Sequence, residues 1–123
     1  MPPKEVLLGK PGAPYATAIK ANGFLFVSGN VSIEPDGKLV DGDIKVQTNQ
    51  VLQNLRRIIE SQGASLSDVV KTNVYLTNIQ DFAGMNEAYR LFFSGEPPTR
   101  TTVGVKELAR PEFIVEIDLI VAL

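Results

Sequence analysis

The sequence contains no cysteine and no histidine. Without cysteine the protein cannot form disulfides, use a thiolate nucleophile or hold a soft metal through sulfur. Without histidine it lacks the most frequent general base and the commonest transition-metal ligand. These absences exclude Ser-His and Cys-His catalytic triads and His-ligated zinc sites. Any catalysis must therefore use carboxylates, amines, guanidinium groups, phenols, hydroxyls, amides or the backbone.

Strong net charge and long apolar segments are also missing. The formal net charge is −2, from 12 Lys and Arg against 14 Asp and Glu, which leaves no electrostatic surface suited to nucleic acid. No segment approaches the roughly 18 apolar residues of a membrane span. Residues 1–12 resemble neither a signal peptide nor a mitochondrial presequence. We therefore expect a cytoplasmic protein that binds neither nucleic acid nor a membrane.

The length of the chain predicts one domain spanning residues 1–123. Hydrophobic residues make up 44% of it, enough for a core. A domain of this size buries only about two-thirds of its unfolded surface. Self-association would increase that burial.

A β-hairpin is predicted near the start of the chain. Asn22 and Gly23 separate two apolar segments, residues 15–21 and 24–28. Asn-Gly between such segments is a strong hairpin signal, because both central residues of the turn need positive φ. We expect strands over both segments.

Two amphipathic helices are predicted farther along. Apolar residues recur at helical spacing over residues 43–62 and again over residues 79–94. Either Asp41 or Asp43 can cap the first helix, and Asn78 can cap the second.

Further strands are predicted over residues 69–76, 101–105 and 113–123. In the first of them, one face should carry Val70, Thr72, Val74 and Leu76, and the other Lys71, Asn73 and Tyr75. The resulting order is two or three strands, a helix, a strand, a helix and two strands. This order is typical of an α+β fold in which both helices pack on one face of a mixed sheet.

Two carboxylates on the last predicted strand are candidates for a functional role. Alternation places Glu116 and Asp118 on one strand face together with Ile114, Ile120 and Ala122. The simplest interpretation is the solvent-facing side of an antiparallel sheet. A solvated face is rarely so aliphatic, however, and like charges side by side repel. The mixture also suits a subunit interface or a cleft, and both interpretations stay open.

Arg100 is the next candidate. It follows Pro97 and Pro98, which fix φ and stiffen the approach to a predicted strand. Its guanidinium fork matches a carboxylate in bidentate geometry. An ordinary surface or structural ion pair is the simpler interpretation of a lone arginine.

Four further residues are candidates for lining a ligand pocket, each with an ordinary structural alternative. Ser28 and Gly29 end a strand, where glycine permits close approach of a ligand or simply marks the strand end. Tyr15 can present its phenol to a pocket or pack in the core. Asn86, beside core-facing positions of the second helix, can bind a ligand or remain solvated.

Taken together, these segments resemble the RidA/YjgF family, also called the endoribonuclease L-PSP family. The similarity spans residues 12–121, and its most specific part is Pro98-Thr99-Arg100-Thr101, where family members carry a Pro-x-Arg-Ser/Thr motif. Supporting segments agree in order and spacing: Pro14-Tyr15, Val27-Ser28-Gly29, Val69-Val70-Lys71-Thr72, Asp81-Phe82-Ala83, Asn86-x-x-Tyr89-x-x-Phe92-Phe93 and Val115-Glu116-Ile117-Asp118.

The resemblance implies a chorismate-mutase-like fold that forms a homotrimer with a ligand cleft at each subunit junction. It also implies the activity of a 2-iminobutanoate/2-iminopropanoate deaminase, which hydrolyses reactive enamines and imines to 2-keto acids and ammonia. The expected substrate is a small imino or enamino acid, such as 2-aminoacrylate or its tautomer 2-iminopropanoate. No cofactor and no metal are expected, because neither carboxylate binding nor water activation requires one here.

Carried over position by position, the resemblance implies catalytic roles for Arg100 and Asp118. Arg100 would hold the substrate carboxylate, helped by the backbone N–H of Thr102, and Asp118 would orient the attacking water. Asp118 stands where the family has Glu, whereas Glu116 aligns with a different family position. The implied substrate-binding residues are Tyr15, Ser28, Gly29, Asn86, Arg100 and Thr102.

Two other functions stay open. Relatives have also been described as non-catalytic trimers that bind small carboxylates or partner proteins in a regulatory or chaperone-like role, so the fold alone does not decide. RNA cleavage has been proposed for some relatives. It fits poorly with the net charge of −2, the lack of histidine and the lack of a basic stripe.

Overall fold

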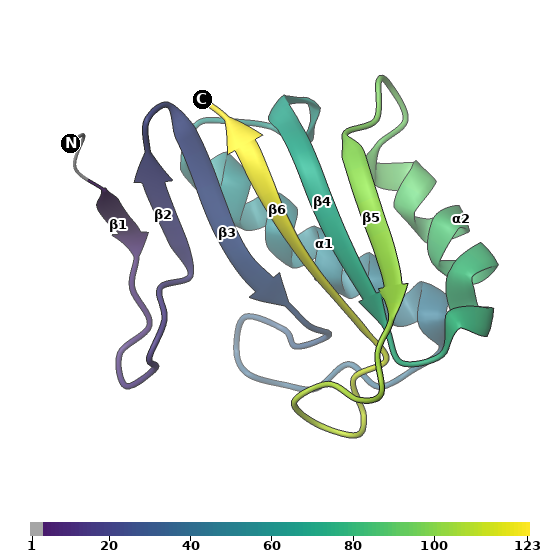
Figure 1. The fold of residues 1–123 in the computed structure, drawn as a ribbon. Helices are drawn as coiled ribbons and strands as arrows, with labels where there is room; N and C mark the ends of the chain where they lie inside the picture. Colours follow the sequence, from purple (N-terminus) through teal and green to yellow (C-terminus); the bar gives the residue numbers. More distant parts are fainter. Residues whose placement is uncertain (1–3) are drawn as a thin grey trace.

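The computed structural model describes residues 4–123, in which two helices pack on one face of a six-stranded mixed sheet (Figure 1). The elements are β1 (Glu5–Leu8), β2 (Ala18–Ala21), β3 (Phe24–Asn30), α1 (Ile44–Ser61), β4 (Val69–Leu76), α2 (Phe82–Phe92), β5 (Thr99–Gly104) and β6 (Val115–Ala122), with 3₁₀ turns at Leu66–Asp68 and Ile79–Asp81. The strand order is β1-β2-β3-β6-β4-β5. The β4–β5 pair is parallel and the other neighbouring pairs are antiparallel. The predicted α+β arrangement is confirmed.

The predicted hairpin is present, but its first strand is shorter than expected. Asn22 and Gly23 have φ values of 54° and 82°, as the turn requires. β2 begins at Ala18 rather than at residue 15, because Gly12 at φ 82° and Pro14 belong to the turns and bends that precede it. Tyr15 is therefore in a loop. β1, which pairs with β2 at the sheet edge, was not located from the sequence, although two or three strands were expected before the first helix.

The first helix begins where its cap predicts, whereas the second α-helix begins later than predicted. Asp43 rather than Asp41 caps α1, accepting a hydrogen bond from the Val46 backbone N–H at 3.0 Å. Asn78 accepts a hydrogen bond from the Gln80 N–H at 3.0 Å. That cap starts a 3₁₀ turn, and the α-helix itself runs only from residue 82 to 92 instead of 79 to 94. Within residues 4–123, no helix has the length and apolarity to cross a membrane.

The face assignment of β4 needs one correction. Val69 is buried and Val70 is 40% exposed, so Val70 does not share a face with the buried Thr72 as predicted. The reason is an irregularity in the pairing of β4 with β6 between Val69 and Lys71, which switches the alternation. From Thr72 onward the predicted face is confirmed, and Thr72 is buried.

The sheet face without helices, called the open face below, carries both charged and apolar side chains. β6 alternates as predicted: its buried residues face the helices, and Glu116 and Asp118 are half-buried on the open face. Phe24 and Phe26 pair with Ala122 and Ile120 on the same face. The two phenylalanines are 38% and 44% exposed. Apolar exposure of this kind on a sheet is typical of an interaction surface.

The loop that enters β6 is fixed by Gln47 of α1, which is fully buried. Its Nε2 donates to the Glu112 carbonyl at 2.8 Å, and its Oε1 accepts from the Ile114 N–H at 3.1 Å. Gln47 thus sets where the strand carrying Glu116 begins.

Replacing Gln47 with leucine should destabilise the protein by about 2–4 kcal/mol, because two partly buried backbone groups lose their partners. Urea unfolding followed by circular dichroism measures the change. Gln53→Leu is the matched control, since Gln53 lies on the same helix and is exposed. Equal stability losses for the two variants would contradict the assigned role.

Candidate active site

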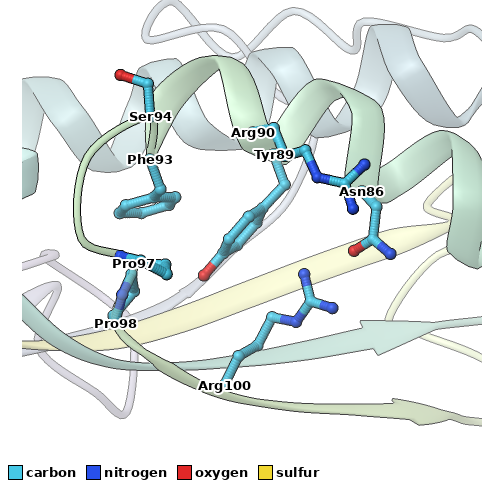
Figure 2. Close-up of a pocket in the computed structure, with 8 residues that line it drawn as sticks. All are labelled: Asn86, Tyr89, Arg90, Phe93, Ser94, Pro97, Pro98 and Arg100. Atoms are coloured by element: carbon cyan, nitrogen blue, oxygen red, sulfur yellow. The ribbon is translucent and has the colours of Figure 1, made fainter.

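A cavity of about 710 Å³ lies between α2 and the start of β5 (Figure 2). This arginine cavity is lined by Asn86, Tyr89, Arg90, Phe93, Ser94, Pro97, Pro98 and Arg100. Its volume lies within the roughly 300–1,000 Å³ of small-molecule sites. It mixes aromatic rings with guanidinium and amide groups, as sites for small polar ligands do.

Arg100 is held in this cavity by aromatic side chains of α2. In the β4–β5 register it pairs with Thr72, so its side chain projects toward the helices. Its Cζ lies 4.8 Å from the Tyr89 ring centroid and 5.5 Å from that of Phe82, and its Nη1 is 3.9 Å from the Met85 sulfur. Such stacking orients a guanidinium and leaves its N–H groups available. Among residues 4–123 no carboxylate forms an ion pair with it. The fork is therefore free to bind an anion.

Tyr89 supports this arrangement from α2 (Figure 2). Its hydroxyl lies 2.8 Å from Thr72 Oγ1, and the ring is buried. Burial raises the pKa of Tyr89, so it is a neutral phenol at physiological pH. Tyr89 therefore gives Arg100 an uncharged platform with a fixed position.

A second cavity, of about 500 Å³, lies beside the end of β3 and the start of β6. This glutamate cavity is lined by Lys10, Tyr15, Ser28, Gly29, Val31, Ile33, Ala109, Arg110, Phe113 and Glu116. Lys10 Nζ donates to the Tyr15 hydroxyl at 3.3 Å, and Ser28 Oγ donates to the Ala16 carbonyl at 2.6 Å. Three residues predicted to bind substrate, Tyr15, Ser28 and Gly29, thus meet here.

Glu116 is the carboxylate of this cavity, and it lies directly against Gly29. A Cβ atom at position 29 would be 2.2 Å from Glu116 Oε2, so any larger residue would displace the carboxyl group. Burial raises the pKa of Glu116, and the negative charge of Asp118 raises it further. No cation among residues 4–123 forms an ion pair with Glu116.

We expect Gly29→Ala to move the Glu116 carboxyl group outward with little loss of stability, because the far end of a flexible side chain can yield. The pKa of Glu116 should then fall toward its ordinary value as the group gains solvent. Carboxyl NMR titration of Glu116 measures this. Gly9→Ala is the control, since nothing lies within 4 Å of a Cβ at that position. An unchanged Glu116 titration in Gly29→Ala would show that the contact is not what keeps the carboxyl group in place.

Asp118 is held differently. Its Oδ1 accepts from Asn73 Nδ2 at 2.8 Å, and its Oδ2 accepts from the Tyr75 hydroxyl at 3.0 Å. Burial and the hydrogen bond to Asp118 raise the pKa of Tyr75. Two fixed donors, one to each oxygen, set the orientation of the Asp118 carboxyl group. The remaining lone pairs of the carboxylate can still accept from water.

Known proteins match nearly the whole chain. Residues 8–123 match the family model described as Endoribonuclease L-PSP. A RutC family protein of Pyrococcus horikoshii is 47% identical over 112 residues, which cover 90% of this chain and 88% of the relative. The chain belongs to the RidA/YjgF/L-PSP family.

Solved structures of Rid proteins share the fold. The Rid family protein YyfA from Yersinia pestis has a TM-score of 0.91 at 36% identity, covering 98% of this chain and 100% of that one. RidA from an Antarctic Psychrobacter has a TM-score of 0.86 at 35% identity, covering 94% of both chains. The predicted family and the α+β fold are thus confirmed. The cytoplasmic location stays a prediction, because a relative from Saccharomyces cerevisiae, 39% identical over 107 residues that cover 86% of this chain and 74% of the relative, is described as mitochondrial.

Within one chain of this family member, the predicted catalytic pair is not brought together. Arg100 is on the helix-covered side of the sheet, whereas Asp118 pairs with Asn73 on the open face. Asn86 shares the arginine cavity with Arg100. Thr102 follows Arg100 on the same strand face, but it does not line the cavity, and its hydroxyl is buried without a partner.

Sequence reasoning missed three charged residues that line the cavities, Arg90, Lys10 and Arg110, and it missed the contact that Glu116 makes. Arg90 follows Asn86 by one helical turn, a spacing that placed the two on the same face and was available from the sequence. Glu116 was recognised as facing the same way as Asp118, but not as lying against Gly29. That contact depends on the pairing of β3 with β6, which is interrupted between Val27 and Asn30. Within residues 4–123 no group of carboxylates is arranged to hold a metal ion.

Proposed function

We propose that this protein is an imine deaminase that acts as a homotrimer, with each active site at a junction between subunits. The substrates are 2-aminoacrylate, 2-iminopropanoate and similar small imino acids, and the products are 2-keto acids and ammonia. One observation carries the proposal: among residues 4–123, Arg100 in one cavity and Glu116 in another each lack an ion-pair partner, as expected for complementary halves of one site.

Arg100 binds the carboxylate of the imino acid. A guanidinium that is already stacked loses little freedom when it forms two parallel hydrogen bonds to a carboxylate. The neighbouring Asn86 amide supplies a donor and an acceptor for the rest of the ligand. Fixing the carboxylate in this way fixes the position of the imine carbon, which is bonded directly to the carboxylate carbon.

The two carboxylates of β6 then carry out the hydrolysis. Asp118 orients a water molecule whose oxygen bonds to the imine carbon, while the C=N π pair moves to nitrogen. The water gives one proton to Asp118 as it adds, and Glu116 gives a proton to the nitrogen, which forms a carbinolamine. As the C–N bond then breaks, the amino nitrogen takes the proton held by Asp118 and the hydroxyl gives its proton to Glu116, so that ammonia leaves, the C=O group forms and both carboxyl groups return to their starting states. The raised pKa of Glu116, caused by burial and by the Asp118 charge, makes its carboxyl group more readily protonated and so suits it to this exchange.

The open face supports the assembly. Its exposed Phe24, Phe26 and Val103, which are 38%, 44% and 39% exposed, lie on the same face as Glu116 and Asp118. Packing this face against other copies would bury apolar surface at roughly 25 cal/mol per Å². We infer a chorismate-mutase-like trimer in which the arginine cavity of one subunit adjoins the β6 carboxylates of its neighbour.

A coupled assay tests the proposal. An amino acid oxidase or dehydratase generates 2-iminopropanoate, and its decay is followed with and without the protein. We expect faster decay and stoichiometric ammonia release with the wild type. No acceleration, combined with retained pyruvate binding, would favour a non-catalytic carboxylate-binding trimer instead. Salt-dependent RNA binding with cleavage would favour the nuclease alternative.

A further inference from the structure

A second guanidinium opens into the arginine cavity, and the proposed reaction does not use it. Figure 2 shows Arg90 and Asn86 extending from α2 and Arg100 extending from β5 into the same space. The residues that line the cavity include two cations and no carboxylate. Two positive groups around one cavity give it more positive charge than the single negative charge of a monocarboxylate would neutralise.

The usual partner of Arg90 is engaged elsewhere. Glu87, three residues earlier on α2, is the neighbour with which a helical arginine commonly pairs. Instead Glu87 forms an ion pair with Lys45 of α1. Among residues 4–123 no other carboxylate forms an ion pair with Arg90. Arg90 thus faces the cavity with its hydrogen-bonding groups available.

We infer that Arg90 forms a second anion subsite in the arginine cavity, and that the preferred substrates are 2-imino acids with an acidic side chain. This inference rests on the proposed function, since it assigns the 1-carboxylate to Arg100. The side-chain carboxylate of a four- or five-carbon 2-imino dicarboxylate then binds Arg90, with Asn86 between the two anchors. The dicarboxylate is hydrolysed by the same steps as a monocarboxylic imine: water adds to C2, ammonia leaves, and a 2-keto dicarboxylate forms.

An ordinary structural role for Arg90 makes a different prediction. A cation in the last turn of a helix stabilises the helix dipole, a role that lysine would preserve. A bidentate carboxylate site requires the planar fork, which lysine lacks. The Arg90→Lys variant therefore separates the two roles.

The test compares two substrates in one assay. Imines are generated by amino acid oxidases from aspartate and from alanine, and kcat/KM is measured for each. The wild type should favour the dicarboxylic imine, and Arg90→Gln should lower the ratio of dicarboxylic to monocarboxylic kcat/KM by about 10- to 100-fold, as expected for one charge-assisted anchor. Arg90→Lys should recover only part of that ratio. Arg57→Gln, an exposed arginine of α1 outside the cavity, is the matched control.

A binding measurement keeps this inference separate from the proposed function. Calorimetry with oxaloacetate and with pyruvate should show a preference for oxaloacetate that Arg90→Gln removes, whether or not either imine is hydrolysed. Equal affinities for the two keto acids, or a ratio that Arg90→Gln leaves unchanged, would overturn the subsite while leaving the deaminase proposal intact. Dissociation of the oligomer by Arg90→Gln would also overturn it, by showing that Arg90 pairs with another copy.

Discussion

Arg100→Gln is expected to lower kcat/KM for imine hydrolysis by about 100- to 1,000-fold, because two charge-assisted hydrogen bonds to the substrate carboxylate are lost. The loss should appear mainly in KM if Arg100 contributes equally to ground-state and transition-state binding. It should extend to kcat if orientation of the imine carbon also fails. Steady-state kinetics with 2-iminopropanoate distinguishes the two. Pyruvate binding should weaken in parallel.

Two comparisons make this result specific. Arg100→Lys keeps the charge without the fork and should recover activity only partly. Arg56→Gln is the control, because the Arg56 guanidinium also lies over an aromatic ring, 5.1 Å from the centroid of Phe92, but outside the arginine cavity. Turnover by Arg100→Gln within about threefold of the wild type would remove carboxylate binding by this residue, and with it the proposed site.

The elements that local chemistry determines were predicted well. The Asn22-Gly23 turn needs positive φ at both residues, and few other sequences satisfy that need without strain. Asp43 caps α1 because its short side chain reaches the free N–H of Val46. Alternation along β6 is strict because one face is buried throughout. Each of these features depends on residues close together in the chain.

The features that were missed depend on pairing between distant segments. The short edge strand β1 has no apolar alternation of its own and forms by pairing with β2. The exposure of Val70 follows from an irregularity against β6. Nothing near Val70 in the sequence marks this change of face, since the partner strand lies 45 or more residues away.

The arrangement of the site also depends on pairing between distant segments, and the sequence did not reveal it. The family resemblance named Arg100 and Asp118, and the sequence placed each on a strand. Sheet order then puts β4 between their strands, and register puts the two side chains on opposite faces. A site that uses both residues requires a second copy of the chain. The composition and the mixed open face had already suggested self-association, but the division of the site between two cavities depends on the topology.

Glu116→Gln is expected to reduce kcat by about 10²- to 10⁴-fold, the usual contribution of a positioned acid or base. Substrate affinity should change little, because Arg100 binds the carboxylate. Asp118→Asn should also be severely impaired, but through water orientation. The pH profile separates them: the wild-type rate should depend on a group that titrates above the ordinary glutamate range, and Glu116→Gln should lose this dependence. A Glu116→Gln enzyme with normal kcat and an unchanged profile would assign the proton transfer to another group.

Although Glu116→Gln should lower kcat, it should raise the stability of the folded protein at neutral pH. Burial and the Asp118 charge raise the pKa of Glu116 in the folded state, so ionised Glu116 costs stability there. That cost is absent below the ordinary pKa and grows as pH rises through the raised pKa. Glutamine carries no such cost. Tm should therefore be similar for variant and wild type at acidic pH and higher for Glu116→Gln at neutral pH, as expected where a residue serves catalysis at the expense of stability. Asp118→Asn should lower the pKa of Glu116, measured by NMR titration, because the repelling negative charge of Asp118 is gone.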